Sequence, residues 1–426
     1  MLNSLARLPY YHETAFRLLH LVNIDGAGDW PSRCNHGYSW PAALLPYRDI
    51  HLELNPLLPV ADISLLDDDA NQERRAKYRA LMRKLLVDRI DLARVERILA
   101  AAEAGNREEE DNNNNDFPLD AYNGFYCAVA VCRHAYRWAM IPVVKAAQRE
   151  KTLELPWPYL QRHFGCRAEA GNLTSNIVHN FDEKGELVYK INVGMSDLIQ
   201  SSEDTFFRML YDLEVQAFPI YYEMIRVLTS YESGDKEACL RHLEEIHWRL
   251  RGSLSIFYDR LQDSKVARSV WLSYIQGFQG WGVGRYINNK YIKHDGVSGS
   301  HVLFFQALDA FLGLGRYLTD EAMDLYIPRR QRDLCMALRE HSIRARLCGK
   351  EDAGIIAGFD KIVDQMRVFR AAHRTRVMPY LKQPAPERMP MTAGKSLLTY
   401  EGGPSDLNEA LKVLDDMLGK RFNQTV

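Results

Sequence analysis

Helical periodicity is the feature that most constrains the fold of this chain. Between residues 71 and 104, apolar residues recur at intervals of three and four among charged ones, and residues 352–380 repeat the pattern. This spacing puts the apolar side chains on one face of an α-helix. Further helices are predicted at 121–148, 202–229, 236–261, 266–275, 301–314, 328–347 and 405–421, and Pro219 should kink the second of these.

Only one segment carries a clear strand pattern. Residues 177–181 and 187–193 are rich in β-branched and aromatic residues, and they flank the turn Asp182-Glu183-Lys184-Gly185. A turn with glycine at its end between two such runs is typical of a β-hairpin. We therefore expect a mostly α fold with one small β-hairpin.

The pattern also suggests a division of the chain at residue 116. The first 65 residues or so are rich in proline and have little periodicity, which is typical of an irregular arm. Residues 105–116 hold runs of glutamate and asparagine, a composition typical of a loop. We predict an N-terminal region over 1–116, made of the arm, a helix and this acidic, Asn-rich loop, followed by a large helical domain over 117–426.

Composition excludes several classes of protein. The 426 residues are 46% hydrophobic and 26% charged, as in soluble globular proteins. With 54 basic against 56 acidic residues, the chain has no positive surplus for binding nucleic acid. No apolar run is long enough to cross a bilayer, and charged residues interrupt any secretory signal at the N-terminus. Seven scattered cysteines fit a reducing compartment, so we expect a cytoplasmic protein with no membrane partner.

Familiar catalytic signatures are absent from the sequence. His242 and His247 are five residues apart, which separates them by roughly 140° around a helix, too far for one zinc ion. The glycines between 277 and 284 do not form the dinucleotide-binding pattern, and residues 296–300 do not form a serine-hydrolase elbow. The sequence therefore predicts neither a zinc-protease helix, nor a dinucleotide fold, nor a serine nucleophile.

One histidine stands out by its position on a helix. Counting back from His373 in steps of four and three gives an unbroken apolar face. The ring should therefore point into the core, where its nitrogens need a partner. Two interpretations are open: His373 is either a core histidine with a hydrogen bond or a metal ligand.

A second unusual residue is Asp309, in a segment that is hydrophobic on nearly all sides. A carboxylate there needs a cationic partner, and Arg370, one turn before His373, is the candidate. A buried Asp–Arg pair beside a core-facing histidine is what a helical haem pocket needs: an axial nitrogen, a cation for a propionate, and apolar walls. The alternative interpretation is an ordinary salt bridge between two helices.

These residues belong to a longer pattern. Asp295-Gly296-Val297-Ser298-Gly299-Ser300-His301, FFQALDAFLG at 304–313, FRAAH at 369–373 and EGGPSDL at 401–407 resemble, in order and spacing, the C-terminal half of the indoleamine 2,3-dioxygenase superfamily. FRAAH also resembles a helix of the divergent pyrrolnitrin-pathway enzyme that rearranges chlorinated tryptophan. Upstream, LELPWPYL at 153–160 and the aromatic pair at 206–207 fall where the family has its distal pocket, so the resemblance covers about residues 120–421.

The resemblance implies a helical domain that holds b-type haem. His373 would be the axial iron ligand, and Arg370, paired with Asp309, would lie near a propionate. Phe206 and Phe207 would line the distal side. The loop from Gly296 through Ser298 to Gly299 would lie where O2 and substrate meet, and His163 is either a distal polar group or a surface histidine.

The sequence also departs from the family pattern. In tryptophan-cleaving members an arginine grips the substrate carboxylate and a serine follows the paired aromatics, whereas the aligned residues here are Leu272 and Leu210. Arg208 or Arg268 could replace the missing clamp. We expect a haem-dependent oxygenase that oxidises an indole or tryptophan-like substrate with O2. The alternatives are a pyrrolnitrin-type rearrangement or an aromatic hydroxylation in the same pocket, a haem-binding sensor without turnover, and a helical scaffold without a cofactor.

Overall fold

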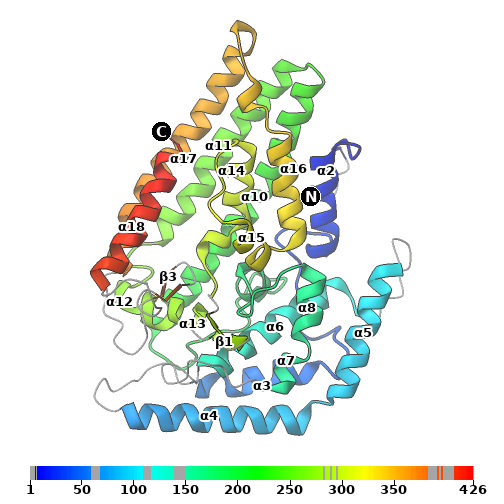
Figure 1. Ribbon diagram of the computed structural model, residues 1–426, viewed down its shortest axis with the longest axis vertical. Helices are drawn as coiled ribbons and strands as arrows, with labels where there is room; N and C mark the ends of the chain where they lie inside the picture. Colours follow the sequence, from blue (N-terminus) through cyan, green and yellow to red (C-terminus); the bar gives the residue numbers. More distant parts are fainter. Residues whose placement is uncertain are drawn as a thin grey trace.

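The computed structural model is mostly helical, as predicted (Figure 1). It describes residues 5, 7–58, 68–108, 117–138, 150–281, 284–287, 290–293, 296–381, 391–392, 395–396 and 407–425. The strands in these ranges form two antiparallel two-stranded ladders. They pair β1 (Gly284–Ile287) with β2 (Lys290–Lys293), and β3 (Met391–Thr392) with β4 (Lys395–Ser396). None of the helices in the described ranges is both long and apolar enough to cross a membrane.

The N-terminal region is more helical than its proline content predicts. Its elements are α2 (Glu13–His20), the π-helix η1 (Leu21–Asp25), α3 (Leu45–Leu54), the 3-10 turn η2 (Asn55–Leu57), α4 (Asp68–Arg89) and α5 (Leu92–Glu108). The single helix predicted at 71–104 is two helices, because the Asp91 carboxylate accepts the backbone N–H of Arg94 at 3.1 Å and starts a new one. The predicted loop lies outside the described residues from 109 to 116.

The two strands of the hairpin predicted at 177–193 are not formed, although the predicted turn is: Gly185 donates its N–H to the Asp182 carbonyl at 2.8 Å. The segment follows α6 (Leu119–Trp138), α7 (Lys151–Glu154), α8 (Trp157–Phe164) and α9 (Leu173–Asn176), and it contains η3 (Val178–Asn180) and one isolated bridge, between Phe181 and Leu187. Beyond this bridge the Asn180 side chain binds the backbone of Tyr189: its Oδ1 accepts the Tyr189 N–H at 2.8 Å, and its Nδ2 donates to the Tyr189 carbonyl at 3.0 Å. Side-chain bonds of this kind compete with strand pairing.

The second half of the chain is a bundle of long helices. The helix α10 (Asp197–Glu232) continues through Pro219 and packs along α11 (Lys236–Arg260). The remaining elements, in chain order, are α12 (Arg268–Val270), the π-helix η4 (Trp271–Gln276), α13 (Gly277–Gln279), η5 (Gly299–His301), α14 (Leu303–Phe311), α15 (Asp320–Tyr326), α16 (Arg329–Glu340), η6 (Arg344–Arg346), η7 (Lys350–Asp352), α17 (Ala353–Leu381) and α18 (Leu407–Asn423).

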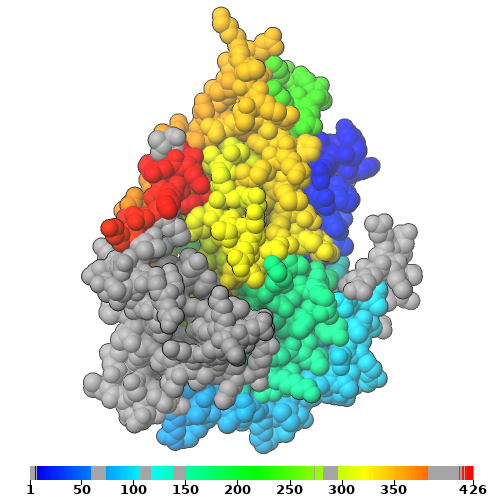
Figure 2. Space-filling model, in the orientation of Figure 1, coloured from blue at the N-terminus to red at the C-terminus, as the bar shows by residue number. Residues whose placement is uncertain are grey.

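The two ends of the chain flank this bundle. The C-terminal α18 packs along α17, and α2 packs against α16 (Figure 1). On the face drawn in Figure 2, α18 (red) and α2 (blue) lie on opposite sides of the yellow segment that holds α14 to α16. One contiguous hydrophobic core runs from Leu5 to Leu381, so both sides of residue 116 contribute to it. The division at residue 116 stays a prediction.

A buried carboxylate fixes the start of α14. Glu214 of α10 accepts hydrogen bonds from the backbone N–H of Phe304 at 3.0 Å, the indole N–H of Trp30 at 3.1 Å and the hydroxyl of Tyr221 at 2.9 Å. A helix N-terminus has unpaired N–H groups that favour such an anion. Glu214 therefore ties the N-terminal region to the helix that carries Asp309.

Candidate functional site

An apolar cavity lies among α10, α11, η4, α14, α17 and α18. Its empty space is about 1310 Å³, part of which is open to solvent. Its walls are mostly aromatic and aliphatic, with a small number of polar groups. The aromatic and polar lining residues are Phe206, Phe257, Trp271, Phe305, Tyr317, Phe369 and Tyr380, and Gln276, Ser298, Ser300, Gln306, Arg370, His373 and Arg421.

His373 reaches this cavity from the end of the predicted apolar face of α17. The residues below it on that face, Phe359, Ile362 and Met366, are at most 1% exposed. The imidazole is partly buried and packs on Phe257, with ring centroids 4.9 Å apart. Burial, followed by the charge of Arg421, lowers the pKa of His373 to about 4. The ring is therefore neutral at pH 7 and has one nitrogen lone pair.

No hydrogen bond to either ring nitrogen of His373 occurs within the part of the chain that the structure describes. The two interpretations of this histidine can therefore be compared. A core histidine with a satisfied ring would have a donor or acceptor within hydrogen-bond distance. The described residues offer His373 aromatic contacts instead, with Phe257 and with Phe369 at 5.8 Å between centroids. This geometry favours a ring that is free to bind a ligand.

Asp309 is paired as predicted, and it has a second partner. Arg370 donates from Nη2 to Asp309 Oδ1, and Arg421 of α18 donates from Nη2 to Asp309 Oδ2 at 2.6 Å. Arg370 also donates from Nη1 to the backbone carbonyl of Arg421 at 2.9 Å. The Asp309 side chain is only 3% exposed, so both of its oxygens are neutralised in a nearly dry environment.

The ion-paired group carries a net charge. Two guanidinium groups against one carboxylate leave one positive charge where Arg370 and Arg421 line the cavity. Burial lowers the pKa of Arg370, while the charge of Asp309 opposes this shift. Such a wall can hold an anionic group of a ligand, because an arginine guanidinium can bind a carboxylate with two parallel hydrogen bonds (bidentate binding).

Another wall of the cavity includes the predicted glycine loop, which is held by close packing. A Cβ added to Gly296 would lie 2.4 Å from the carbonyl oxygen of Gln279, so only glycine fits there. The next residue, Val297, donates its N–H to the same carbonyl at 2.8 Å. Gly296 itself does not line the cavity, whereas Ser298, Gly299 and Ser300 do. A Cβ at Gly299 would meet nothing within 4 Å.

Side chains from outside the loop complete its support. Gln306 of α14 donates to the carbonyl of Ser300 at 2.8 Å, and Gln276 of η4 donates to the carbonyl of Val297 at 3.3 Å. Ser298 Oγ accepts the N–H of Ser300 at 3.2 Å and starts the short helix η5. The loop therefore presents neutral polar groups to the cavity from a fixed position.

The predicted distal residues are only partly brought together. Phe206 lines the cavity, whereas Phe207 lies on a neighbouring side of α10 and is fully buried in the core. His163 lies on α8, outside the cavity, where it stacks on Tyr122 at 4.3 Å between ring centroids. It is neither a surface histidine nor a cavity group, and burial lowers its pKa to about 3.

The expected carboxylate clamp is not found among the cavity residues. Leu210 lines the cavity, while Leu272 is buried beside it. Arg208 lies outside the lining and donates to the carbonyl of Gly185 at 2.8 Å. Arg268 also lies outside it, with its guanidinium 5.9 Å from the ring centre of Tyr380.

The arginines that line the cavity are those paired with Asp309, and sequence reasoning missed Arg421. The sequence indicated only that Arg421 lies at the end of the helix predicted at 405–421. No protein-family model matches this chain, and a search of curated proteins finds no match. The resemblance seen in the sequence therefore stays a prediction. The residues of the cavity are the basis for proposing a function.

Proposed function

We propose that the cavity binds haem b, with His373 as the axial iron ligand, and that the protein is a haem-dependent oxygenase. The observation that carries the proposal is a neutral imidazole on an apolar cavity wall, with no hydrogen-bond partner among the described residues. Axial ligation by histidine needs a lone pair of this kind, and the apolar walls around it would exclude water from the iron.

The ion-paired group fits the polar edge of haem. Arg370 and Arg421 would hold a propionate, because they line the cavity and together with Asp309 carry one positive charge. Asp309 would orient both guanidinium groups, because each of them donates a hydrogen bond to its carboxylate. The same ion pairs would join α14, α17 and α18 around the cofactor.

The substrate would be an indole or a tryptophan-like aromatic. Haem supplies an iron centre at which O2 is activated toward an electron-rich ring. The protein's part is to orient that ring against Phe206 and Leu210 and to keep water away. Ser298 and Ser300 offer neutral hydrogen-bonding groups on the fixed loop, which suit an indole N–H or a carbonyl better than a carboxylate.

The lack of an arginine beside Leu210 favours substrates with a modified or absent carboxylate. A missing charge-assisted pair is worth about 1.5–3 kcal/mol, or roughly one to two decades in affinity. Free L-tryptophan should therefore bind this much more weakly than its best indole analogue. The same feature favours, as a second candidate, a rearrangement or hydroxylation of such an indole in place of ring cleavage.

The test uses the haem-reconstituted full chain. Indole, indole-3-propionate, tryptamine and L-tryptophan are added to the ferrous protein, and both the spectral shift and O2 consumption are measured. We expect indole and tryptamine to perturb the spectrum and support O2 consumption, with the two carboxylates, L-tryptophan and indole-3-propionate, the weaker ligands. Haem binding without any indole-dependent O2 consumption would contradict the oxygenase and indicate a sensor. Efficient conversion of L-tryptophan would contradict the missing clamp, and Arg268→Ala and Arg208→Ala would then identify its replacement.

A further inference from the structure

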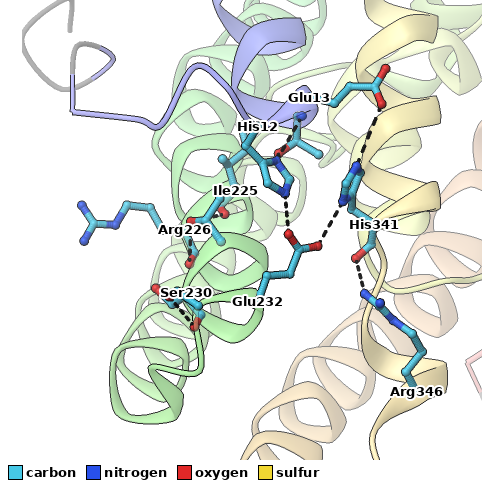
Figure 3. Close-up of polar contacts among 11 residues, drawn as sticks. His12, Glu13, Ile225, Arg226, Ser230, Glu232, His341 and Arg346 are labelled. Atoms are coloured by element: carbon cyan, nitrogen blue, oxygen red, sulfur yellow. Dashed lines mark hydrogen bonds and ion pairs between the residues drawn. The ribbon is translucent and has the colours of Figure 1, made fainter.

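Two histidines and a glutamate that are far apart in the sequence lie close together in the fold, outside the cavity. His12 precedes α2, Glu232 ends α10, and His341 follows α16 (Figure 3). One ligand atom from each of the three lies within 4.8 Å of the others. The His12 and His341 rings are 4.4 Å apart between centroids. The fold thus brings an N-terminal segment and two bundle helices to one point.

The Glu232 carboxylate lies between the two imidazoles. Its Oε2 is 3.0 Å from His12 Nε2, and its Oε1 is 3.1 Å from His341 Nδ1. Two ligand atoms on a tetrahedral zinc ion, with bonds of ~2.0 Å, are separated by ~3.3 Å. Both nitrogen–oxygen separations are close to that value, but they involve different carboxylate oxygens, and the three ligand atoms lie within 4.8 Å of one another. The side chains must therefore close by up to about 1.5 Å to hold one cation.

The other nitrogen of each ring faces a group that can orient it. His12 Nδ1 accepts the backbone N–H of Thr14 at 3.3 Å and lies 2.8 Å from the Thr14 hydroxyl. The ring proton is therefore on Nε2, toward Glu232, and it must move to Nδ1, beside the Thr14 hydroxyl, when Nε2 binds a metal. His341 Nε2 faces the Glu13 carboxylate at 3.9 Å. Arg17 holds that carboxylate at 3.0 Å. Metal-binding histidines almost always donate their second N–H to an acceptor, which fixes the ring and raises its basicity. The Thr14 hydroxyl lies within that distance of His12, whereas the Glu13 carboxylate must approach His341 from 3.9 Å to serve in this way.

Burial and charge also suit a cation. His12 is 8% exposed, whereas the side chains of His341 and Glu232 are 29% and 34% exposed, so the group is reachable from solvent on one side. Desolvation opposes ionisation of Glu232, but hydrogen bonds and charge from His341 and His12 outweigh it and lower its pKa. A cation that binds here must displace the protons that now join the carboxylate to the two rings.

We propose that His12, Glu232 and His341 form a binding site for a divalent transition-metal cation, with Zn²⁺ the best match. Two nitrogen ligands and one oxygen ligand suit zinc, and leave one position for water. A bound cation would join the N-terminal region to α10 and α16. The proposal is independent of the cavity and of any haem it binds.

The test is a calorimetric Zn²⁺ titration of the haem-free full chain after removal of metals with a chelator. All proteins carry Cys348→Ser, because Cys348 is the exposed free thiol. The parent should bind one more zinc equivalent than His341→Ala or Glu232→Gln, or bind it at least about 100-fold more tightly, since even outer-shell changes cost 10–100-fold. Glu13→Gln should weaken binding about 10-fold.

Three controls distinguish zinc binding at this site from binding elsewhere and from a loss of folding. His20→Ala removes a histidine of the same helix that does not belong to the group, and should leave the tight site intact. Mg²⁺, which prefers oxygen ligands, should neither bind nor raise the melting temperature. Glu232→Gln keeps a hydrogen-bonding side chain, so its metal-free melting curve separates lost folding from lost binding. Equal zinc affinity in the parent, His341→Ala and Glu232→Gln would overturn the proposal and leave a hydrogen-bonded bridge only.

Discussion

The two walls of the cavity are held in place by different forces. On one side, α14, α17 and α18 meet through the buried carboxylate of Asp309 and two arginines. On the other, the loop at 296–300 is fixed by backbone contact at Gly296 and by neutral side-chain hydrogen bonds. One wall depends on charge compensation, and the other on the absence of a side chain. Substitutions in the two walls should therefore lower the free energy of unfolding by different amounts. Only in the charged wall should a second substitution recover part of the loss.

The largest effect is expected on the charged wall. Asp309→Ala leaves Arg370 and Arg421 buried without their shared anion, and breaking a buried pair costs about 3–5 kcal/mol. Urea unfolding of the haem-free protein measures the loss. Arg370→Met alone should cost less than Asp309→Ala, because Arg421 still pairs with Asp309. The double variant should be more stable than the sum of the two single losses predicts. Strict additivity would show that the charges do not compensate each other.

A smaller effect is expected on the loop wall, and two glycines give a matched pair. Gly296→Ala places a Cβ 2.4 Å from a backbone oxygen that cannot move independently, so we expect a loss of about 1–3 kcal/mol. Gly299→Ala meets nothing within 4 Å and should leave the melting temperature nearly unchanged. If Gly299 borders the ligand, its variant should weaken ligand binding without a loss of stability. Equal destabilisation by both variants would contradict the close-packing account.

The most gradual effect is the pH dependence that His373 adds to the charged wall, at up to about 1.4 kcal/mol per pH unit. The folded ring stays neutral down to about pH 4, whereas the unfolded ring takes up a proton near its ordinary pKa of about 6.5. The unfolded state thus binds more protons between these values, so the free energy of unfolding falls as the pH falls from about 6.5 to 4. Above pH 6.5 this group adds no pH dependence.

The variant His373→Leu isolates that contribution. In haem-free protein its stability should fall less steeply than that of the parent across this window, by up to about 1.4 kcal/mol per pH unit. Chemical unfolding at half-unit pH steps measures both curves. Parallel curves would mean that the folded ring titrates near its ordinary pKa, and hence that the cavity does not desolvate it.

The sequence predicted the charged wall better than the loop wall, and the reason is local periodicity. His373 and Arg370 lie on one helix, where spacing alone gives their directions. Asp309 lies in a segment so apolar that its burial could be predicted. Arg421 pairs with Asp309 across 112 residues, and such a contact leaves no mark on local sequence.

The failed predictions have physical causes of the same kind. The hairpin predicted at 177–193 is reduced to a turn and one bridge, because residues 178–180 form a 3-10 helix and the Asn180 side chain binds the backbone of Tyr189 where a strand would pair. Phe207 was assigned to the distal wall together with Phe206, but its side chain is fully buried in the core and does not line the cavity. His163 was placed by alignment with a segment, and its packing against Tyr122 depends on a different helix.

The central claim, that His373 ligates haem in this cavity, is tested most directly by optical titration of the haem-free chain. Haemin is added to the parent, to His373→Ala and to His373→Ala with imidazole, and the Soret band is followed in the ferric and the ferrous, CO-bound forms. The account predicts a saturable Soret shift in the parent, its loss in His373→Ala, and its recovery with imidazole, which fills the space left by the ring. An unchanged Soret spectrum and haem affinity in His373→Ala would contradict it.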